Sequence, residues 1–285
     1  MTIPLAHVIG DPIEQSKSPI IHKFWLSKLG IPGNYTKRHV KPGGLADYLE
    51  EMRADSCWRG CNVTMPHKQR IMDHLDQLDP VARAVGAVNT VVRQDDGSLI
   101  GFNTDVEGFL EPLSDVLAQS HLFRMARIIG TGGAARAIVA GLAASGFTMV
   151  LAGRNPDKAA SLLGDLAPGA EHYVADLAHF ADPTAFEFDD RQGCLDLIVN
   201  ASPLGMKRHS PLHFDWSHAP PGSIAYDIVT DPARTDFLEL AEKNGATTID
   251  GLSMLIGQAA AAFEKFFQQA PPRQDDPELR GLLTQ

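Results

Sequence analysis

A lysine and a carboxylate that could move a proton lie in the N-terminal third of the chain. Lys68 ends a run of polar and small residues at 60–68, and Asp105 follows Asn103 and Thr104. A lysine ammonium can give a proton to a carbonyl oxygen as hydride arrives, or accept it back in the reverse direction, and a nearby carboxylate can orient that lysine. The two residues therefore predict a reversible carbonyl reduction.

Small polar side chains around this pair predict the kind of substrate. Ser16 and Ser18 are two apart in a loop and can direct both hydroxyls at a carboxylate. The neutral side chains that could hydrogen-bond vicinal hydroxyls are Asn62, Thr64, Asn89 and Gln258. Each of these could instead be a cap or turn residue. Together they indicate a small polyhydroxylated acid.

A glycine-rich turn in the middle of the chain predicts a dinucleotide site. The turn comprises Gly130, Thr131, Gly132, Gly133 and Ala134. It follows an apolar strand and precedes a helix, so its backbone and the helix amides could approach a pyrophosphate. The spacing is G-x-G-G rather than G-x-G-x-x-G, which leaves a glycine turn without a ligand as the alternative.

The residues after the next strand indicate which dinucleotide binds. A carboxylate there would favour a free ribose hydroxyl, but this chain has Arg154 and Asn155, with Lys158 one turn later. The two cations favour a 2′-phosphate and therefore NADP, and all three residues are predicted cofactor contacts. Asp157 keeps NAD open as a less favoured alternative, and an Arg154 that merely faces solvent is the other.

Apolar periodicity places these motifs on an α/β framework. In the first half we expect strands at 6–10, 61–64, 84–92 and 98–102 and helices at 19–29, 68–78 and 106–117. In the second half we expect strands at 127–129, 148–152, 195–201 and 223–228 and helices at 133–144 and 251–269. The order predicts an N-terminal α/β substrate domain, a Rossmann-type dinucleotide-binding domain, and a C-terminal helix returning to the first. The domain boundaries are expected at 1–106 with 251–285, and at 107–250.

Composition excludes several other classes of protein. A chain of 285 residues with a formal net charge of −10 is large enough for two domains and repels nucleic acid and anionic membranes. No apolar stretch is long enough to span a bilayer and no secretory signal is evident, so the cytoplasm is expected. Three cysteines fit no common zinc template and are expected to be reduced thiols. Pro211 interrupts any helix that could align His209, His213 and His218, so no metal is predicted.

Six motifs, in order, resemble those of the shikimate dehydrogenases. They lie at residues 16–19, 62–68, 86–90, 103–105, 130–136 and 250–258 and cover nearly the whole chain. The resemblance implies NADPH-dependent reversible reduction of 3-dehydroshikimate to shikimate, in aromatic amino-acid biosynthesis. It implies that Ser16 and Ser18 hold the substrate carboxylate and that Lys68 and Asp105 serve proton transfer. It also assigns Thr64, Asn89 and Gln258 to the substrate and Arg154 and Lys158 to the cofactor.

Two departures from the family pattern leave alternatives open. Many members have a tyrosine three residues after the aspartate that ends the late strand, where this chain has Asp227 followed by Thr230. Many also have Asn-Arg-Thr or Asn-Arg-Ser at the adenosine end, where residues 153–155 read Gly-Arg-Asn. A quinate or dual quinate/shikimate dehydrogenase using NAD is the nearest rival, and a noncatalytic dinucleotide-dependent sensor is another. The sequence does not separate a monomer from a homodimer.

Overall fold

The computed structural model describes residues 3–169, 171–188 and 191–285. These residues form two compact units, one comprising the chain up to residue 108 together with 256–285, and the other comprising 109–255. The boundaries fall inside helices α4 (Asp105–Leu110) and α10 (Gly251–Phe267). The predicted α/β architecture with a C-terminal helical segment in the first unit is confirmed.

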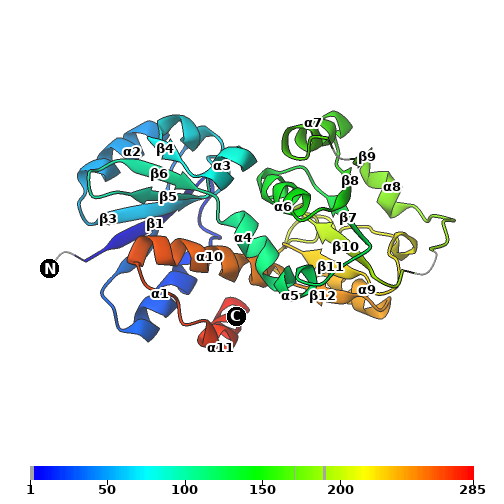
Figure 1. Cartoon of the computed structure of the whole chain (residues 1–285). Coiled ribbons are helices and arrows are strands. Elements are labelled where there is room, and N and C mark those ends of the chain that lie inside the picture. The colour runs from blue at the N-terminus through cyan, green and yellow to red at the C-terminus, as the bar shows by residue number, and fades with distance from the viewer. Residues whose placement is uncertain (1–2, 170, 189–190) are drawn as a thin grey trace. The chain divides into compact units, whose positions relative to one another are not determined.

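A mixed six-stranded sheet forms the centre of the first unit (Figure 1). Its strands in chain order are β1 (Leu5–Gly10), β2 (Asn34–His39), β3 (Trp58–Val63), β4 (Gln77–Leu78), β5 (Thr90–Arg93) and β6 (Leu99–Phe102). The spatial order is β2-β1-β3-β5-β6-β4. Strands β2, β1 and β3 are parallel, whereas β5 runs antiparallel to both β3 and β6. The carboxyl end of β3 and the start of β5 therefore lie at the same edge.

Helices cover both faces of this sheet (Figure 1). They are α1 (Ser18–Leu29), α2 (Leu45–Ala54), α3 (Pro80–Val85) and the C-terminal part of α10, while α11 (Asp276–Leu283) packs against α1. Helices α2 and α3 contribute to one hydrophobic core, and α10 contributes to another. None of the described helices combines the length and the apolar character needed to cross a bilayer.

Alternation along β1 explains why two cores form. Ala6 and Val8 pack with Phe266 of α10, and Ile9 packs with Trp58 in the core beneath α2. Successive strand residues point to opposite faces, so a nearly continuous apolar strand is expected where both faces are covered. The position of β1 inside the sheet agrees with this pattern.

Two elements predicted between residues 68 and 92 are wrong. The segment expected to be a helix at 68–78 forms a short 3₁₀ helix at Arg70–His74 and then strand β4. Here the Asp76 amide donates to the Leu99 carbonyl at 3.0 Å, which draws the chain into the sheet. The segment expected to be a strand at 84–92 begins inside α3, whose N-cap Asp79 accepts a hydrogen bond from Ala82 at 2.7 Å. The strand starts only at Thr90.

The second unit contains a parallel six-stranded sheet. Its strands are β7 (Phe123–Ile129), β8 (Thr148–Ala152), β9 (Tyr173–Ala175), β10 (Cys194–Asn200), β11 (Ile224–Asp227) and β12 (Thr247–Ile249). The spatial order β12-β11-β10-β7-β8-β9 is that of a dinucleotide-binding sheet, with the direction of strand order reversing between β7 and β10. Its main helices after α4 are α5 (Ser114–Leu117), α6 (Gly133–Ala144), α7 (Pro156–Leu166), α8 (Leu177–Ala181) and α9 (Asp236–Lys243). The predicted Rossmann-type topology is confirmed.

Candidate functional site

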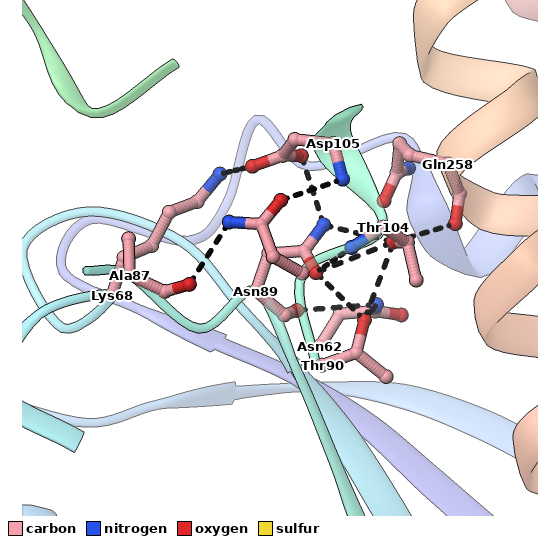
Figure 2. Close-up of polar contacts among 9 residues, drawn as sticks. Asn62, Lys68, Ala87, Asn89, Thr90, Thr104, Asp105 and Gln258 are labelled. Carbon is pink, nitrogen blue, oxygen red and sulfur yellow. Dashed lines mark hydrogen bonds and ion pairs between the residues drawn. The ribbon is translucent and has the colours of Figure 1, made fainter. Parts of the chain in front are cut away.

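Lys68 and Asp105 form an ion pair in the first unit (Figure 2). The Lys68 Nζ atom lies 2.6 Å from Asp105 Oδ2. The carboxylate side chain is 8 % exposed and the lysine side chain 17 %, so the lysine end keeps some access to solvent. Because an ammonium has three donors, Lys68 can hold Asp105 and still donate to another oxygen. The two predicted proton-transfer residues are therefore in direct contact.

Asn89 fixes the other oxygen of this carboxylate. Its Nδ2 atom donates to Asp105 Oδ1 at 2.8 Å and to Thr104 Oγ1 at 2.9 Å. Its Oδ1 atom accepts from the Thr104 amide at 2.8 Å. Asn89 is buried just before β5, so its amide group is committed to holding residues 104 and 105 in place. Fully satisfied buried networks of this kind hold their members in one geometry.

Asn62 belongs to the same polar cluster and is linked to Asn89 through Thr90 (Figure 2). Its Nδ2 atom donates to Thr90 Oγ1 at 3.0 Å, and its Oδ1 atom accepts from the Tyr35 hydroxyl at 2.6 Å. Thr90 in turn donates to Asn89 Oδ1 at 3.0 Å. Tyr35 and Thr90 carry no motif of their own, and sequence reasoning missed them. Only the pairing of β1 with β2 and of β3 with β5 brings them beside Asn62.

Ser16 and Ser18 lie side by side at the start of α1. The Ser16 hydroxyl donates to that of Ser18 at 3.3 Å, which is consistent with the predicted parallel direction of the two hydroxyls. Ser18 also hydrogen-bonds the buried Tyr35 hydroxyl, whose pKa is raised far above its ordinary value, chiefly by burial. Through Tyr35 the serine pair is linked to Asn62.

Thr64 and Gln258 come from two other elements of the first unit. Thr64 follows the end of β3, and its methyl group lies where a side chain on Gly10 would have to be, 2.5 Å from an added Cβ. Gln258 is on α10, and its backbone carbonyl accepts from Thr104 Oγ1 at 3.0 Å. The structure thus brings all the predicted substrate-site residues onto the first unit.

A separate pocket of about 510 Å³ lies at the carboxyl ends of the strands in the second unit. It is lined by loops after β7, β8 and β10, including Gly130, Thr131, Gly132, Arg154, Asn155, Lys158, Ser202 and His209. Ligands of such sheets bind at this edge, where the strand order reverses. Among the described residues no group of three or more histidine, cysteine or acidic side chains is arranged to hold a metal ion.

Two glycines of this pocket differ in whether a side chain could replace their hydrogen. Gly130 has φ +119°, and an added Cβ would lie 2.6 Å from the Ala201 carbonyl oxygen, so only glycine fits. Gly132 has an ordinary φ of −83°, and an added Cβ would meet nothing within 4 Å. Gly132 is the N-cap of α6, which begins at Gly133 and continues through Ala134. The turn therefore exposes backbone amides to open space, as a bound pyrophosphate requires.

Positive charge dominates the far end of the same pocket. Arg154 and Lys158 both line it and form no ion pair with any residue that the structure describes, and no acidic side chain lines it. The Asn155 side chain accepts from the Lys158 amide at 3.1 Å and so caps α7. This donor set suits a ligand that carries an extra phosphate group.

Asp227 organises the loop after β10, a role that the sequence did not reveal. It is fully buried at the end of β11 and accepts from Asn200 Nδ2 at 3.0 Å and from Thr235 Oγ1 at 2.6 Å. Asn200 also donates to the Leu204 carbonyl and accepts from the Ser202 hydroxyl. Burial raises the pKa of Asp227 from its ordinary 3.8 to about 6, against the lowering effect of its hydrogen bonds.

Replacing Asp227 by Asn should remove a pH-dependent part of stability. Because the folded-state pKa is raised, protonated Asp227 stabilises the fold fully below pH 3.8, and this contribution is lost as pH rises through about 6. The shift corresponds to ~3 kcal/mol. We expect the free energy of unfolding of the parent protein, measured by urea denaturation, to fall relative to that of Asp227→Asn between about pH 4 and about pH 7. A constant difference across that range would refute the assignment.

Two glycine substitutions should separate folding from nucleotide binding. Gly130→Ala forces a Cβ into the Ala201 carbonyl and should lower the melting temperature of the ligand-free protein. The methyl group of Gly132→Ala meets open space and an allowed backbone conformation. Stability should therefore change by less than about 1 kcal/mol, because loss of the glycine N-cap and the reduced entropy of the unfolded chain oppose each other. The same methyl group should weaken NADPH binding, measured by fluorescence titration. Unchanged NADPH affinity in Gly132→Ala would show that the dinucleotide does not approach this turn.

Models of known protein families match segments of both units. Residues 8–91 match the model of the shikimate dehydrogenase substrate binding domain, and residues 251–275 match that of the shikimate 5′-dehydrogenase C-terminal domain. Residues 126–185 match the model named NADP oxidoreductase, coenzyme F420-dependent. The first two matches contain Lys68 and Gln258, respectively, and the third contains the glycine turn.

Full-length relatives and solved structures are also similar. The chain is 47 % identical to the shikimate dehydrogenase (NADP(+)) of Sphingopyxis alaskensis, over 99 % of this chain and 97 % of the relative. The crystal structure of shikimate 5-dehydrogenase from Thermus thermophilus, in complex with NADP(H) and shikimate, is 32 % identical with a TM-score of 0.81, covering 99 % of this chain and 100 % of that one.

Quinate dehydrogenase from Corynebacterium glutamicum in complex with NAD has a TM-score of 0.83 at 28 % identity, covering 98 % of each chain. The fold therefore does not distinguish the two activities. The sequence identity of 47 % over nearly the whole chain does establish kinship. This chain belongs to the shikimate dehydrogenase family.

Proposed function

We propose that this protein catalyses the NADPH-dependent reversible reduction of 3-dehydroshikimate to shikimate. The observation that carries the proposal is the contact between Lys68 and Asp105, held by Asn89 within a cluster of hydroxyl and amide groups. It combines a proton donor with groups suited to a polyhydroxylated acid. Curated relatives of similar length are named for the same NADP-dependent activity.

The chain's own residues divide the reaction between binding and proton transfer. Ser16 and Ser18 bind the substrate carboxylate, and Thr64 and Gln258 bind ring hydroxyls. Asn62 and Asn89 contribute to the same site, with their amides also holding the surrounding cluster in place. In the direction of reduction, Lys68 Nζ gives a proton to the oxygen of the 3-keto group, and Asp105 orients Lys68. The chain segments 1–106 and 251–285 form the substrate domain.

Residues 107–250 form the cofactor domain in this proposal. NADPH supplies the hydride for the substrate carbonyl carbon when it is bound. The backbone from Gly130 to Ala134 binds the pyrophosphate, while Arg154 and Lys158 bind the 2′-phosphate and Asn155 fixes the first turn of α7 beside them. A guanidinium can make two parallel hydrogen bonds to a phosphate, which an NAD ribose hydroxyl cannot reproduce.

Reduction of 3-dehydroshikimate tests this function directly. The purified protein should consume NADPH in a one-to-one ratio with the shikimate that appears, as quantified by liquid chromatography. Omission of either reactant should stop the reaction. Consumption of NADPH without shikimate, or no consumption at all, would exclude the proposed activity.

A quinate or dual quinate/shikimate activity is the second candidate. Thr230 stands where many family members have a tyrosine that lies near the substrate, so a contact made by that tyrosine in those members can differ in this chain. Comparison of kcat/KM for shikimate and quinate with the same cofactor distinguishes the two activities. We expect shikimate to be preferred, and a higher value for quinate would replace the proposal with the second candidate.

A further inference from the structure

The first unit contains a large pocket that is separate from both the Lys68 and Asp105 cluster and the nucleotide pocket of the second unit. It encloses about 660 Å³, more than the 510 Å³ of the nucleotide pocket. Its lining comes from β3, the end of β5, the end of β6 and the C-terminal end of α10. It shares no lining residue with the Lys68 and Asp105 cluster. Its size is within the range of small-molecule sites.

The pocket has an excess of positive charge. Arg59, Arg93 and Lys265 line it, against a single carboxylate, Asp95. Arg93 is engaged by backbone carbonyls, because its Nε atom donates to Arg53 at 3.1 Å and its Nη1 atom to Gln94 at 3.3 Å. Neither Arg59 nor Lys265 forms an ion pair with any residue of the described ranges. Both cations are half-buried.

Lys265 also borders a neighbouring pocket of about 170 Å³. Asp79 and Glu107 line this smaller pocket, but neither approaches Lys265 within ion-pair distance. The contact that the lysine does make is with an aromatic ring, because its Nζ atom lies 4.4 Å from the ring centroid of Phe102. The ammonium therefore stays available to an anion that enters from the larger pocket.

Three phenylalanine side chains lie beside these cations. Phe102, Phe266 and Phe267 all line the pocket, and the rings of Phe266 and Phe267 are 6.3 Å apart in an edge-to-face arrangement. Phe266 is fixed against β3, where a Cβ on Gly60 would lie 2.8 Å from its ring. Phenylalanine side chains next to two cations suit a ligand that is apolar at one end and anionic at the other.

We propose that this pocket binds a small molecule in which a carboxylate is attached to an aromatic ring. The ring packs against Phe102 and Phe267. The carboxylate reaches Arg59, whose guanidinium can bind both oxygens, and Lys265 adds a second charge. This pocket is separate from the residues proposed to bind and reduce the substrate, so binding to it can be tested whether or not the proposed reaction occurs.

Binding of 4-phenylbutyrate to the full chain, measured by isothermal titration calorimetry with saturating NADPH and shikimate, tests the proposal. We expect saturable binding at one site. The uncharged 4-phenylbutanol, which has the same ring and chain, should bind about 10- to 100-fold more weakly, the usual difference for losing a charge-assisted hydrogen bond. Equal affinity for acid and alcohol, or no saturable binding of the acid up to millimolar concentration, would overturn it.

Variants identify where the acid binds. The double substitution Arg59→Gln with Lys265→Gln should weaken 4-phenylbutyrate binding by about 10- to 100-fold, whereas Arg59→Lys with Lys265→Arg should retain most of it. Ser16→Ala should leave it unchanged, since Ser16 lies outside this pocket. Thermal unfolding of each variant checks that the fold is intact. Binding that is lost in Ser16→Ala and retained in the double glutamine variant would place the acid elsewhere and refute the proposal.

Discussion

Replacing Lys68 by Ala is expected to lower kcat for shikimate oxidation by about 10²- to 10⁴-fold, the range for loss of a general acid or base. The substitution removes the proton carrier and leaves the Asp105 carboxylate buried with Asn89 as its remaining side-chain partner. The affinity for NADPH should change little, because Lys68 does not line the nucleotide pocket. Initial rates at saturating shikimate and NADP, together with NADPH fluorescence titration, measure both effects.

Controls separate proton transfer from loss of charge or of fold. Lys23→Ala removes an exposed lysine of α1 and should leave kcat unchanged. Asp105→Asn keeps the shape of the side chain but removes the charge that orients Lys68, so it should also reduce kcat. Thermal unfolding shows whether each variant is folded. Near-normal turnover of folded Lys68→Ala would remove this residue from the mechanism.

Replacing Arg154 by Ala is expected to weaken NADPH binding by about 10- to 100-fold, the effect of losing one or two charge-assisted hydrogen bonds. NADH affinity should change much less, because NADH has no 2′-phosphate for the guanidinium to bind. The ratio of the two dissociation constants, measured by fluorescence titration for parent and variant, isolates the phosphate contact from general damage to the pocket.

Lys243 provides the matched control for Arg154. It is an exposed cation in the last turn of α9 and does not line the nucleotide pocket. Lys243→Ala should therefore leave both dissociation constants unchanged, apart from a small long-range electrostatic effect that salt screens. If Arg154→Ala weakened NADPH and NADH binding equally, the assignment of Arg154 to the 2′-phosphate would be incorrect.

Elements with a strong local signal were predictable from sequence. The strand at Thr148–Ala152 and the end of α6 at Ala144 agree with the expectation residue for residue. Both belong to a buried parallel sheet, where strands are continuous apolar runs and glycine marks the turns. The strands expected at 195–201 and 223–228 are also confirmed to within a residue or two at each end.

Elements governed by position in the fold were not predictable. Strand β2 reads Asn-Tyr-Thr-Lys-Arg-His, and only its tyrosine is fully buried, because it lies at the edge of the sheet. An edge strand can be polar on most of its length, so apolar periodicity does not reveal it. The helix predicted at 68–78 was wrong because a local pattern was present but did not decide the structure. Apolar residues have helical spacing there, yet part of the segment forms β4, which pairs with β6.

The functional residues also divide into those that a local motif revealed and those that only the fold brings to their partners. Lys68, Asn89 and Asp105 lie in short motifs, so their types and order indicated chemistry before any contact was known. Tyr35 and Thr90 stabilise the polar cluster of the first unit, and Asp227 stabilises a loop of the second unit, but all three are separated from these partners by 27 or 28 residues. Contacts of this kind arise from strand pairing, which no local pattern specifies.

A sensor that binds a dinucleotide without turnover remains the rival from another class. Such a protein would have no need of a lysine that contacts a carboxylate within a cluster of buried amides. Tight NADPH binding with no reaction of any pathway acid would favour it. Detectable turnover that is lost in Lys68→Ala would exclude it.

The most direct test of the proposed function is the rate of formation of reduced nicotinamide, followed by absorbance, with shikimate or quinate as substrate and NADP or NAD as cofactor. We expect kcat/KM to be highest for shikimate with NADP. Exchanging NADP for NAD should lower kcat/KM, because Arg154 and Lys158 then have no 2′-phosphate to bind. Turnover of quinate with NAD but not of shikimate with NADP would contradict both the substrate and the cofactor assignments.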